Sequence, residues 1–163
     1  CLTNPQTYVI ILTESEVNEM KKIYLASPFF SASELVVYKE TIRRLREAGY
    51  SVHVPQEHTI QNAWDYSNWE WAQKVFEMDI NAIYECDVVM VLNFGMYSDS
   101  GTAWEAGFAA ASGKQVVQVL CGYENATYSL MMINGCEFVV EADNVQNWEE
   151  HSAKVYLEKV IQK

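Results

Sequence analysis

The chain has 163 residues, half of them hydrophobic, and a formal net charge of -11. This length suffices for one compact domain with a sizeable hydrophobic core. The acidic balance repels phosphate backbones and anionic lipid, which disfavours nucleic acid and membrane partners and favours a small neutral ligand.

The first 19 residues are expected to be an N-terminal extension, either native or non-native in origin, and residues 20–163 a single domain. The short apolar run in this extension is preceded by no basic residue and followed by acidic ones, so it is not a signal peptide. No run of about 18 apolar residues exists, so no segment is expected to span a membrane.

Cysteine and histidine usage argues against a metal centre. The four cysteines have no spacing typical of metal ligands, which predicts free thiols in a reducing, cytoplasmic setting. His53 and His58 could contribute to a metal site, but no third or fourth ligand lies at a suitable spacing. No metal or other cofactor is therefore expected.

From residue 22 onward, apolar strand-like runs alternate with helical patterns, which is typical of a parallel α/β sheet. The expected strands are residues 22–26, 50–54, 87–92, 115–120 and 137–140. The expected helices are one that Ser31 or Ser33 caps and Gly49 ends, then 69–84, 102–112, a turn at 128–133, and a last helix that Asn144 or Asn147 opens. The pattern predicts a three-layer, about five-stranded sheet of flavodoxin-like, Rossmann-like type.

Ligands of such sheets bind outside the carboxyl ends of the strands. This rule selects four segments, residues 27–30, 55–66, 93–105 and 121–131. Residues 27–30, 93–101 and 121–131 contain no Lys or Arg, and no glycine-rich phosphate loop is evident. A phosphate group would lack its usual partners there.

The densest candidate for chemistry is the pair Asp99 and Glu105, which lie six positions apart between the third strand and the first turn of the next helix. The positive end of a helix keeps a nearby carboxylate ionised. An ionised, positioned carboxylate can attack the anomeric carbon of a sugar. Two structural alternatives remain: Thr102-x-x-Glu105 fits a capping box, and Asp99 fits a turn residue.

The stretch Asp99-Ser100-Gly101-Thr102-Ala103-Trp104-Glu105-Ala106-Gly107 resembles the signature of nucleoside 2-deoxyribosyltransferases. Three further pieces resemble the same family in the same order. They are the first strand and loop at residues 23–30, a helix at 76–83, and Leu130-Met131 after the fourth strand. The resemblance covers residues 22 to about 140.

The resemblance implies a role for each matching residue. Glu105 would form a covalent glycosyl ester, Tyr24 would orient it, and Asp99 and Asp79 would supply or relay the proton to the leaving base. The implied substrate-binding residues are Ser27, Phe29, Gly101, Ser129 and Met131. The substrates would be a deoxyribonucleoside and a free nucleobase in nucleotide salvage. The protein would be a homo-oligomer in which Met131 reaches a neighbour's site.

The residues alone leave alternatives open. Tyr24 in an apolar strand also fits a core aromatic, and Met131 fits a packing residue. Asp79 lies beside an apolar stripe, where a charge needs a reason. The family's Asn before Leu-Met is Ser129 here, and related monophosphate glycosidases place serines near the sugar 5′ end.

The sequence is therefore compatible with three functions. Deoxyribosyl transfer between bases is the leading one, and hydrolysis of (deoxy)nucleosides or their 5′-monophosphates is the alternative. A non-catalytic nucleotide- or flavin-binding module is a further one, but no phosphate loop follows the first strand. A receiver domain is excluded, because it needs an acidic pair where Ser27-Pro28 stands and an Asp where Asn93 stands.

Overall fold

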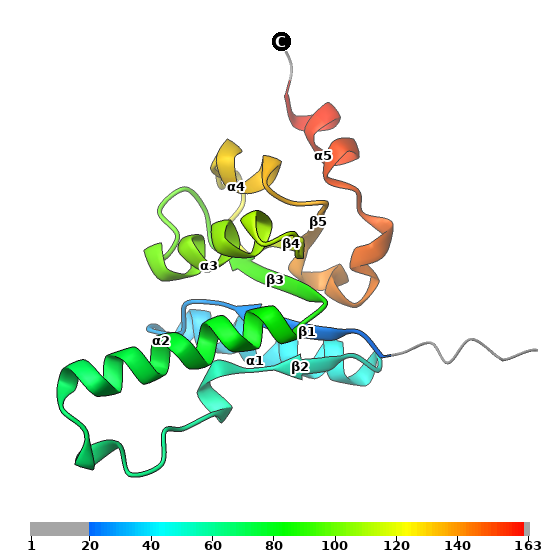
Figure 1. Ribbon diagram of the computed structural model, residues 1–163. Coiled ribbons are helices and arrows are strands. Elements are labelled where there is room, and N and C mark those ends of the chain that lie inside the picture. Colours follow the sequence, from blue (N-terminus) through cyan, green and yellow to red (C-terminus); the bar gives the residue numbers. More distant parts are fainter. Residues whose placement is uncertain (1–19, 162–163) are drawn as a thin grey trace, which may run out of the picture.

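The computed structural model describes residues 20–161, so the N-terminal extension expected at residues 1–19 lies outside the described residues. A five-stranded, all-parallel sheet has the order β2-β1-β3-β4-β5 (Figure 1). The strands are β1 Lys22–Ala26, β2 Ser51–His53, β3 Val88–Asn93, β4 Gln115–Leu120 and β5 Phe138–Glu141. This confirms the predicted fold class and the flavodoxin-like strand order.

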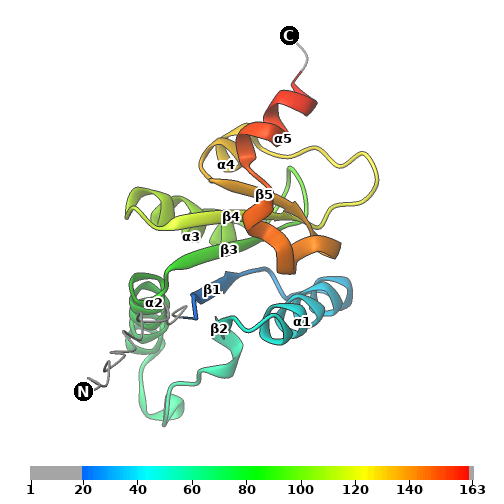
Figure 2. The ribbon, with the colours of Figure 1, turned by 90° about the vertical axis from the view of Figure 1, so that its right-hand side faces the viewer.

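Helices lie on both faces of the sheet and complete the three layers. Figure 2 shows α2 and α3 on one side and α1 on the other. The α-helices are α1 Ala32–Glu47, α2 Asn68–Glu85, α3 Ser100–Ala111, α4 Leu130–Asn134 and α5 Ala153–Val160, and the 3-10 segments are η1 Pro55–Glu57, η2 Ala63–Asp65 and η3 Ala142–Glu150. No helix among residues 20–161 is long and apolar enough to cross a membrane.

Local sequence signals explain where α1 and α2 begin. Ser31 caps α1 in a capping box with Glu34, and Ser67 caps α2 in the same way with Glu70. After α1 the chain turns at Gly49, whose φ of 92° suits glycine.

The two largest apolar clusters fill the spaces between the sheet and helices α1, α2 and α3. On the α1 side, Tyr38, Leu45 and Trp148 pack against alternate residues of β1, β3 and β4. On the α2 and α3 side, Ile83 and Ala109 pack against the other set of strand residues. β3 is buried along its whole length, as the continuous apolar run predicted.

The C-terminal segment differs from the prediction of one long helix opened by Asn144 or Asn147. Residues Ala142–Glu150 form a 3-10 segment with a non-helical kink at Asn147, and α5 begins only at Ala153. The reason is a competing backbone pairing, because the carbonyl of His151 accepts a hydrogen bond of 2.9 Å from the N–H of Val139 in β5. A strand-like contact therefore interrupts the helix.

Candidate active site

The side chains of Tyr24 and Glu105 meet on the α2 and α3 face of the sheet. Tyr24 lies in β1 and Glu105 in α3, and the Tyr24 hydroxyl donates a 2.7 Å hydrogen bond to Oε1 of Glu105. Tyr24 is fully buried, so its ring and hydroxyl are held by the core. The contact positions the carboxylate with a donor from the central part of the sheet.

Glu105 does not carry an ordinary surface carboxylate. Its pKa is raised to about 7, mainly by burial; the hydrogen bond from Tyr24 lowers the pKa, and the charges of Asp79 and Asp99 add smaller rises. The expectation that a helix N-terminus keeps this carboxylate ionised is wrong. α3 begins at Ser100, which places Glu105 in the second turn, and the helix dipole acts mainly within the first.

Asp99 is the N-cap of α3. Its Oδ2 accepts hydrogen bonds from the Thr102 N–H at 2.8 Å and the Thr102 hydroxyl at 3.1 Å. The alternative in which Thr102 and Glu105 form a capping box is therefore wrong, because the helix starts earlier than expected. A Cβ at position 101 would lie 3.0 Å from Asp99 Oδ2, so Gly101 leaves room for this carboxylate to fold over the helix end.

Asp79 is partly buried on α2, one turn before Ala82 and Ile83, which pack in the core cluster that contains Tyr24. Its Oδ1 is buried and has no hydrogen-bond partner. Burial raises the pKa of Asp79, and the charge of His58 opposes this rise. A buried carboxylate without a partner is costly and points to a functional reason for its position.

Within residues 20–161, the other predicted substrate-binding residues make no side-chain hydrogen bond to Glu105, although Met131 lines a cavity with Ala103 and Ala106 of α3. The Ser27 hydroxyl donates to the carbonyl of Pro28 at 2.7 Å, and Phe29 packs on Tyr38 with ring centroids 5.9 Å apart. Ser129 is the N-cap of α4 and makes no side-chain capping hydrogen bond. Met131 is 84% exposed. Their roles stay predictions.

Two histidines beside the site were considered in the sequence only as metal ligands, for which they lack further ligands at a suitable spacing. The rings of His53 and His58 stack at 4.2 Å, and the ring of His53 stacks on Tyr24 at 5.5 Å. Their place could have been noticed, because β2 ends at His53 and His58 belongs to the loop that follows its carboxyl end. Only the fold shows that the two rings touch each other and the ring of Tyr24.

Cations are distributed away from these carboxylates. All three arginines lie on α1, where they pair with Glu40, Glu47 and Glu57. Neither Lys nor Arg contributes to the pKa shifts of Glu105 and Asp79. Within residues 20–161, no group of three or more His, Cys, Asp or Glu side chains is arranged to hold a metal ion. Cys86, Cys121 and Cys136 are free thiols.

A family model described as nucleoside 2-deoxyribosyltransferase matches residues 23–153. Among solved structures, the chain is similar to a 2-deoxyribosyltransferase from the psychrotolerant bacterium Bacillus psychrosaccharolyticus. The identity is 30% and the TM-score 0.67, over 78% of this chain and 91% of that one. Comparison with curated protein sequences found no match.

Two further structures are similar at lower identity and show the fold alone. A conserved protein from Enterococcus faecalis V583 has 21% identity and a TM-score of 0.64, over 85% of this chain and 99% of that one. A CMP N-glycosidase from Clostridium botulinum has 24% identity and a TM-score of 0.51, over 86% and 98% of the two chains.

Proposed function

The chain belongs to the nucleoside 2-deoxyribosyltransferase family, and from this premise we propose that it transfers a 2-deoxyribosyl group from one nucleobase to another. We assign the activity to residues 20–163 as one catalytic domain. The observation that carries the proposal is the 2.7 Å hydrogen bond from Tyr24 to Glu105, a partly buried carboxylate with two further acids near it.

In the first step the ionised Glu105 attacks C1′ of the deoxyribose, and the bond between C1′ and the base nitrogen breaks. A nucleobase leaves poorly as an anion, so a proton passes from Asp79 or Asp99 to the base as it departs. The product of this step is a deoxyribosyl ester of Glu105 and a neutral base. The Tyr24 hydroxyl holds the carboxylate in its attacking orientation.

In the second step a nitrogen of the incoming base attacks C1′, and the ester bond to Glu105 breaks. The incoming base returns one proton to the acid that gave it, Asp79 or Asp99, so the site ends in its starting state. Two displacements retain the anomeric configuration. If water is the acceptor, the same site hydrolyses the nucleoside.

The raised pKa of Glu105 supports a nucleophilic role. Burial removes water that would otherwise solvate the carboxylate, and a more basic carboxylate is the better nucleophile once ionised. Because the pKa of Glu105 lies at about 7, Glu105 is ionised in a large fraction of the molecules at neutral pH. The hydrogen bond from Tyr24 preserves that fraction, since it stabilises the charged form.

Incubation with deoxyinosine or thymidine and a second free base, followed by chromatography, tests the proposal. A new nucleoside supports transfer, and free base with deoxyribose alone supports hydrolysis. Rapid acid quench and mass spectrometry of the Glu105 peptide should then show one added deoxyribosyl group. The matched control is Glu105→Gln, which should show neither the product nor the adduct.

Hydrolysis of a 5′-monophosphate is the second candidate function. The observation that favours it is the Ser129 hydroxyl, which makes no capping bond and is free to contact a sugar 5′ substituent. The absence of Lys and Arg from residues 27–30, 93–101 and 121–131 argues against it. A higher kcat/KM for the monophosphate than for the nucleoside, lost in Ser129→Ala, would establish this function instead.

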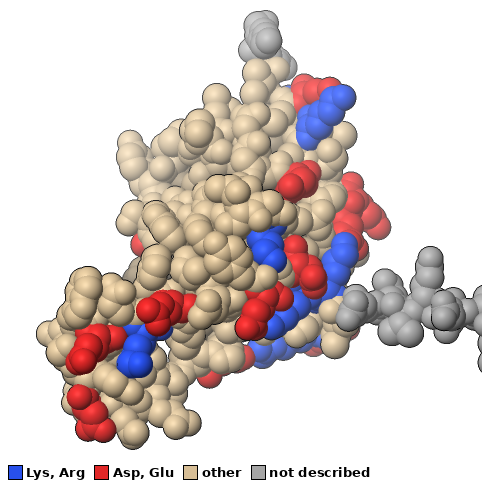
Figure 3. Space-filling model, viewed as in Figure 1, with Lys and Arg blue, Asp and Glu red and all other residues tan. Residues whose placement is uncertain are grey.

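We also propose that the active enzyme is a homo-oligomer with shared sites. Leu130 and Met131 of α4 are exposed, and Phe76 of α2 and Trp104 of α3, whose rings are 5.5 Å apart, each expose about half of their surface. In Figure 3 the area over α3 and α4 is almost free of charged side chains. An apolar surface of this kind is typical of an interface.

The test of the shared site combines mass and activity. Light scattering at assay concentration should show at least a dimer, and dilution should lower the specific activity as subunits separate. Met131→Glu should dissociate the oligomer and lower activity together, whereas Val36→Glu on the exposed side of α1 should do neither. A fully active monomer would refute the shared site.

A further inference from the structure

A polar cavity of about 620 Å³ lies between the edge strand β2 and the outer side of α2. Ser51 and His53 of β2, the loop residue His58, and Met78, Asn81 and Glu85 of α2 contribute to its wall. Asp79 follows Met78 directly, and its neighbours Ala82 and Ile83 one turn later pack in the cluster that contains Tyr24. Asp79 therefore lies at the boundary between the core around the nucleophile and the histidine cavity.

The two histidines form a short stack that leads from this cavity to the site. The rings of His53 and His58 are 4.2 Å apart and nearly parallel at 5°, and His53 stacks on Tyr24 at 13°. Nε2 of His53 is buried without a hydrogen-bond partner, as is Oδ1 of Asp79. Like charges in two stacked rings would repel each other strongly, so the stack favours a single positive charge.

We propose that His58 is a positioning residue that sets the protonation of Asp79, and that its stack on His53 confines the positive charge of the pair to His58, which lines the cavity together with Met78. This rests on the proposed function and takes Asp79, one of its two acids, as the group that gives a proton to the leaving base. A positive charge on His58 stabilises ionised Asp79 and limits the pH range in which Asp79 carries its proton. The charge on the histidine pair, at the edge strand β2, thus changes the pH at which Asp79 loses its proton.

The charges around both groups agree with this direction. Burial raises the pKa of Asp79, and His58 is the neighbour that lowers it. Tyr24 from β1 and Glu105 from α3 also face Asp79, and the pKa of each is raised by the Asp79 charge.

The pKa of His53 explains why the positive charge does not reside on that ring. Burial lowers its pKa, and the charges of His58 and then Lys22 lower it further. The carboxylates Glu85 and Glu57 act in the opposite direction. The positive charge of the pair is therefore disfavoured on His53.

The key variant is His58→Gln, which removes the charge on a side chain that is exposed and belongs to no helix or strand. The limb of the pH–rate profile that reports loss of the Asp79 proton should move to higher pH by about 0.5 to 1 unit. His58→Lys keeps a positive charge and should return the limb towards its wild-type position. Damage to the fold alone would lower the rate at every pH and leave the limb in place.

Direct titration separates this inference from the proposed function. Carboxyl NMR of ¹³C-aspartate-labelled protein, assigned with Asp79→Asn, should show a higher Asp79 pKa in His58→Gln. Ring NMR should show a higher His53 pKa in the same variant. Neither measurement needs a substrate, so both decide the inference even if no nucleoside is turned over.

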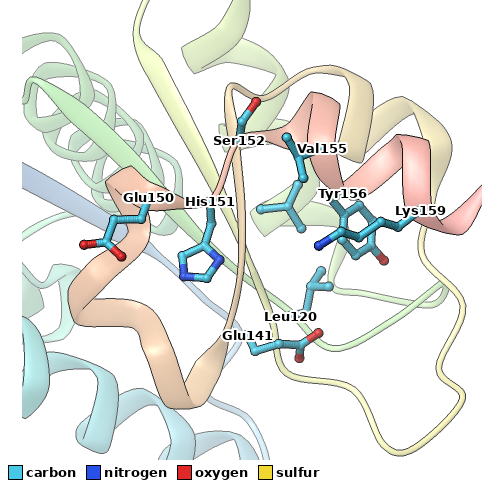
Figure 4. Close-up of a pocket in the computed structure, with 9 residues that line it drawn as sticks. Leu120, Glu141, Glu150, His151, Ser152, Val155, Tyr156 and Lys159 are labelled. Carbon is cyan, nitrogen blue, oxygen red and sulfur yellow. The ribbon is translucent and has the colours of Figure 1, made fainter.

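The third histidine of the chain, His151, offers a matched control. It lines a separate cavity of about 210 Å³ with Glu141 and Lys159, on the side of the sheet near α5 (Figure 4). His151→Gln should leave the pH limb and both titrations unchanged. Unchanged Asp79 and His53 titrations in His58→Gln would overturn the proposal, and so would an equal shift in His151→Gln.

Discussion

The same residue type behaves in opposite ways on α1 and at the candidate active site. On α1, Glu40 accepts hydrogen bonds from Arg43 and Arg44 in solvent, and these lower its pKa to about 2. At the site, Glu105 has no cation beside it, and burial raises its pKa to about 7. One carboxylate is held charged at every ordinary pH, and the other is poised to change its charge near neutrality.

The difference shows what each region contributes. Exposed ion pairs such as those of α1 contribute little to stability, because water solvates each charge well without its partner. The Glu105 carboxylate costs stability, because burial removes solvent from its charge and only the Tyr24 hydroxyl donates to it. Functional sites commonly concentrate such unfavourable groups.

The largest expected effect is on kcat, when the buried Glu105 carboxylate is replaced by an amide. Glu105→Gln should lower kcat for base exchange by at least about 10³-fold, because the amide cannot form the ester. The Tyr24 hydroxyl can still donate to the amide oxygen, so the fold should be intact by circular dichroism. Near-normal turnover would show that Glu105 is not the nucleophile.

Asp99→Asn should slow the chemical step by roughly 10²-fold, since it removes an ionisable group from proton transfer. Asn is also a good N-cap, so α3 should keep its start. The expected result is a lower kcat with a similar KM. The control is Asp65→Asn, an exposed carboxylate on η2, and equal rates for both variants would remove Asp99 from the mechanism.

The cost of the buried charge can be measured as stability. A pKa that rises from 4.5 to about 7 on folding means that this group's contribution is complete below pH 4.5 and is lost as pH rises through 7. At pH 8 the free energy of unfolding of Glu105→Gln, measured with denaturant, should therefore exceed that of wild type by about 1 to 3 kcal/mol. At pH 5 the two proteins should be equally stable. The same difference at both pH values would contradict the burial argument.

Tyr24→Phe should move the acid limb of the rate profile upward from about pH 7. The hydroxyl lowers the pKa of Glu105, so its loss should raise that pKa by about one unit, the value of one hydrogen bond. At pH 7 the rate should fall roughly tenfold relative to wild type, and at higher pH the ratio of the two rates should approach one. A uniform loss at all pH values would mean that Tyr24 acts through packing.

The smallest effect is expected on α1. Glu40→Gln removes the partner of two arginines but leaves every group in water, so the unfolding midpoint should change far less than in Glu105→Gln at pH 8. Activity should be unaffected. A change in stability that matches the active-site variant would erase the contrast between the two regions.

Much of the fold could be predicted because its signals are local. β1 and β4 have the predicted bounds, and the serine at position 31 and the glycine at 49 begin and end α1 as expected. The C-terminal helix was predicted wrongly because His151 pairs with Val139, a contact that no local pattern carries. The start of α3 was placed too late because Asp99, rather than Thr102, supplies the cap.

The sequence by itself determined the family, the parallel sheet and the carboxyl edge at which the acidic motif lies. Buried strands, helix caps and the motif each depend on residues that are close together in the sequence. Only the tertiary structure decided how these acids ionise. Tyr24 and Glu105 are 81 positions apart, and their contact depends on β1 lying beside α3. The stack of His53 and His58 on Tyr24 is likewise invisible in the chain order. Burial and distance set a pKa, and both are properties of the folded molecule.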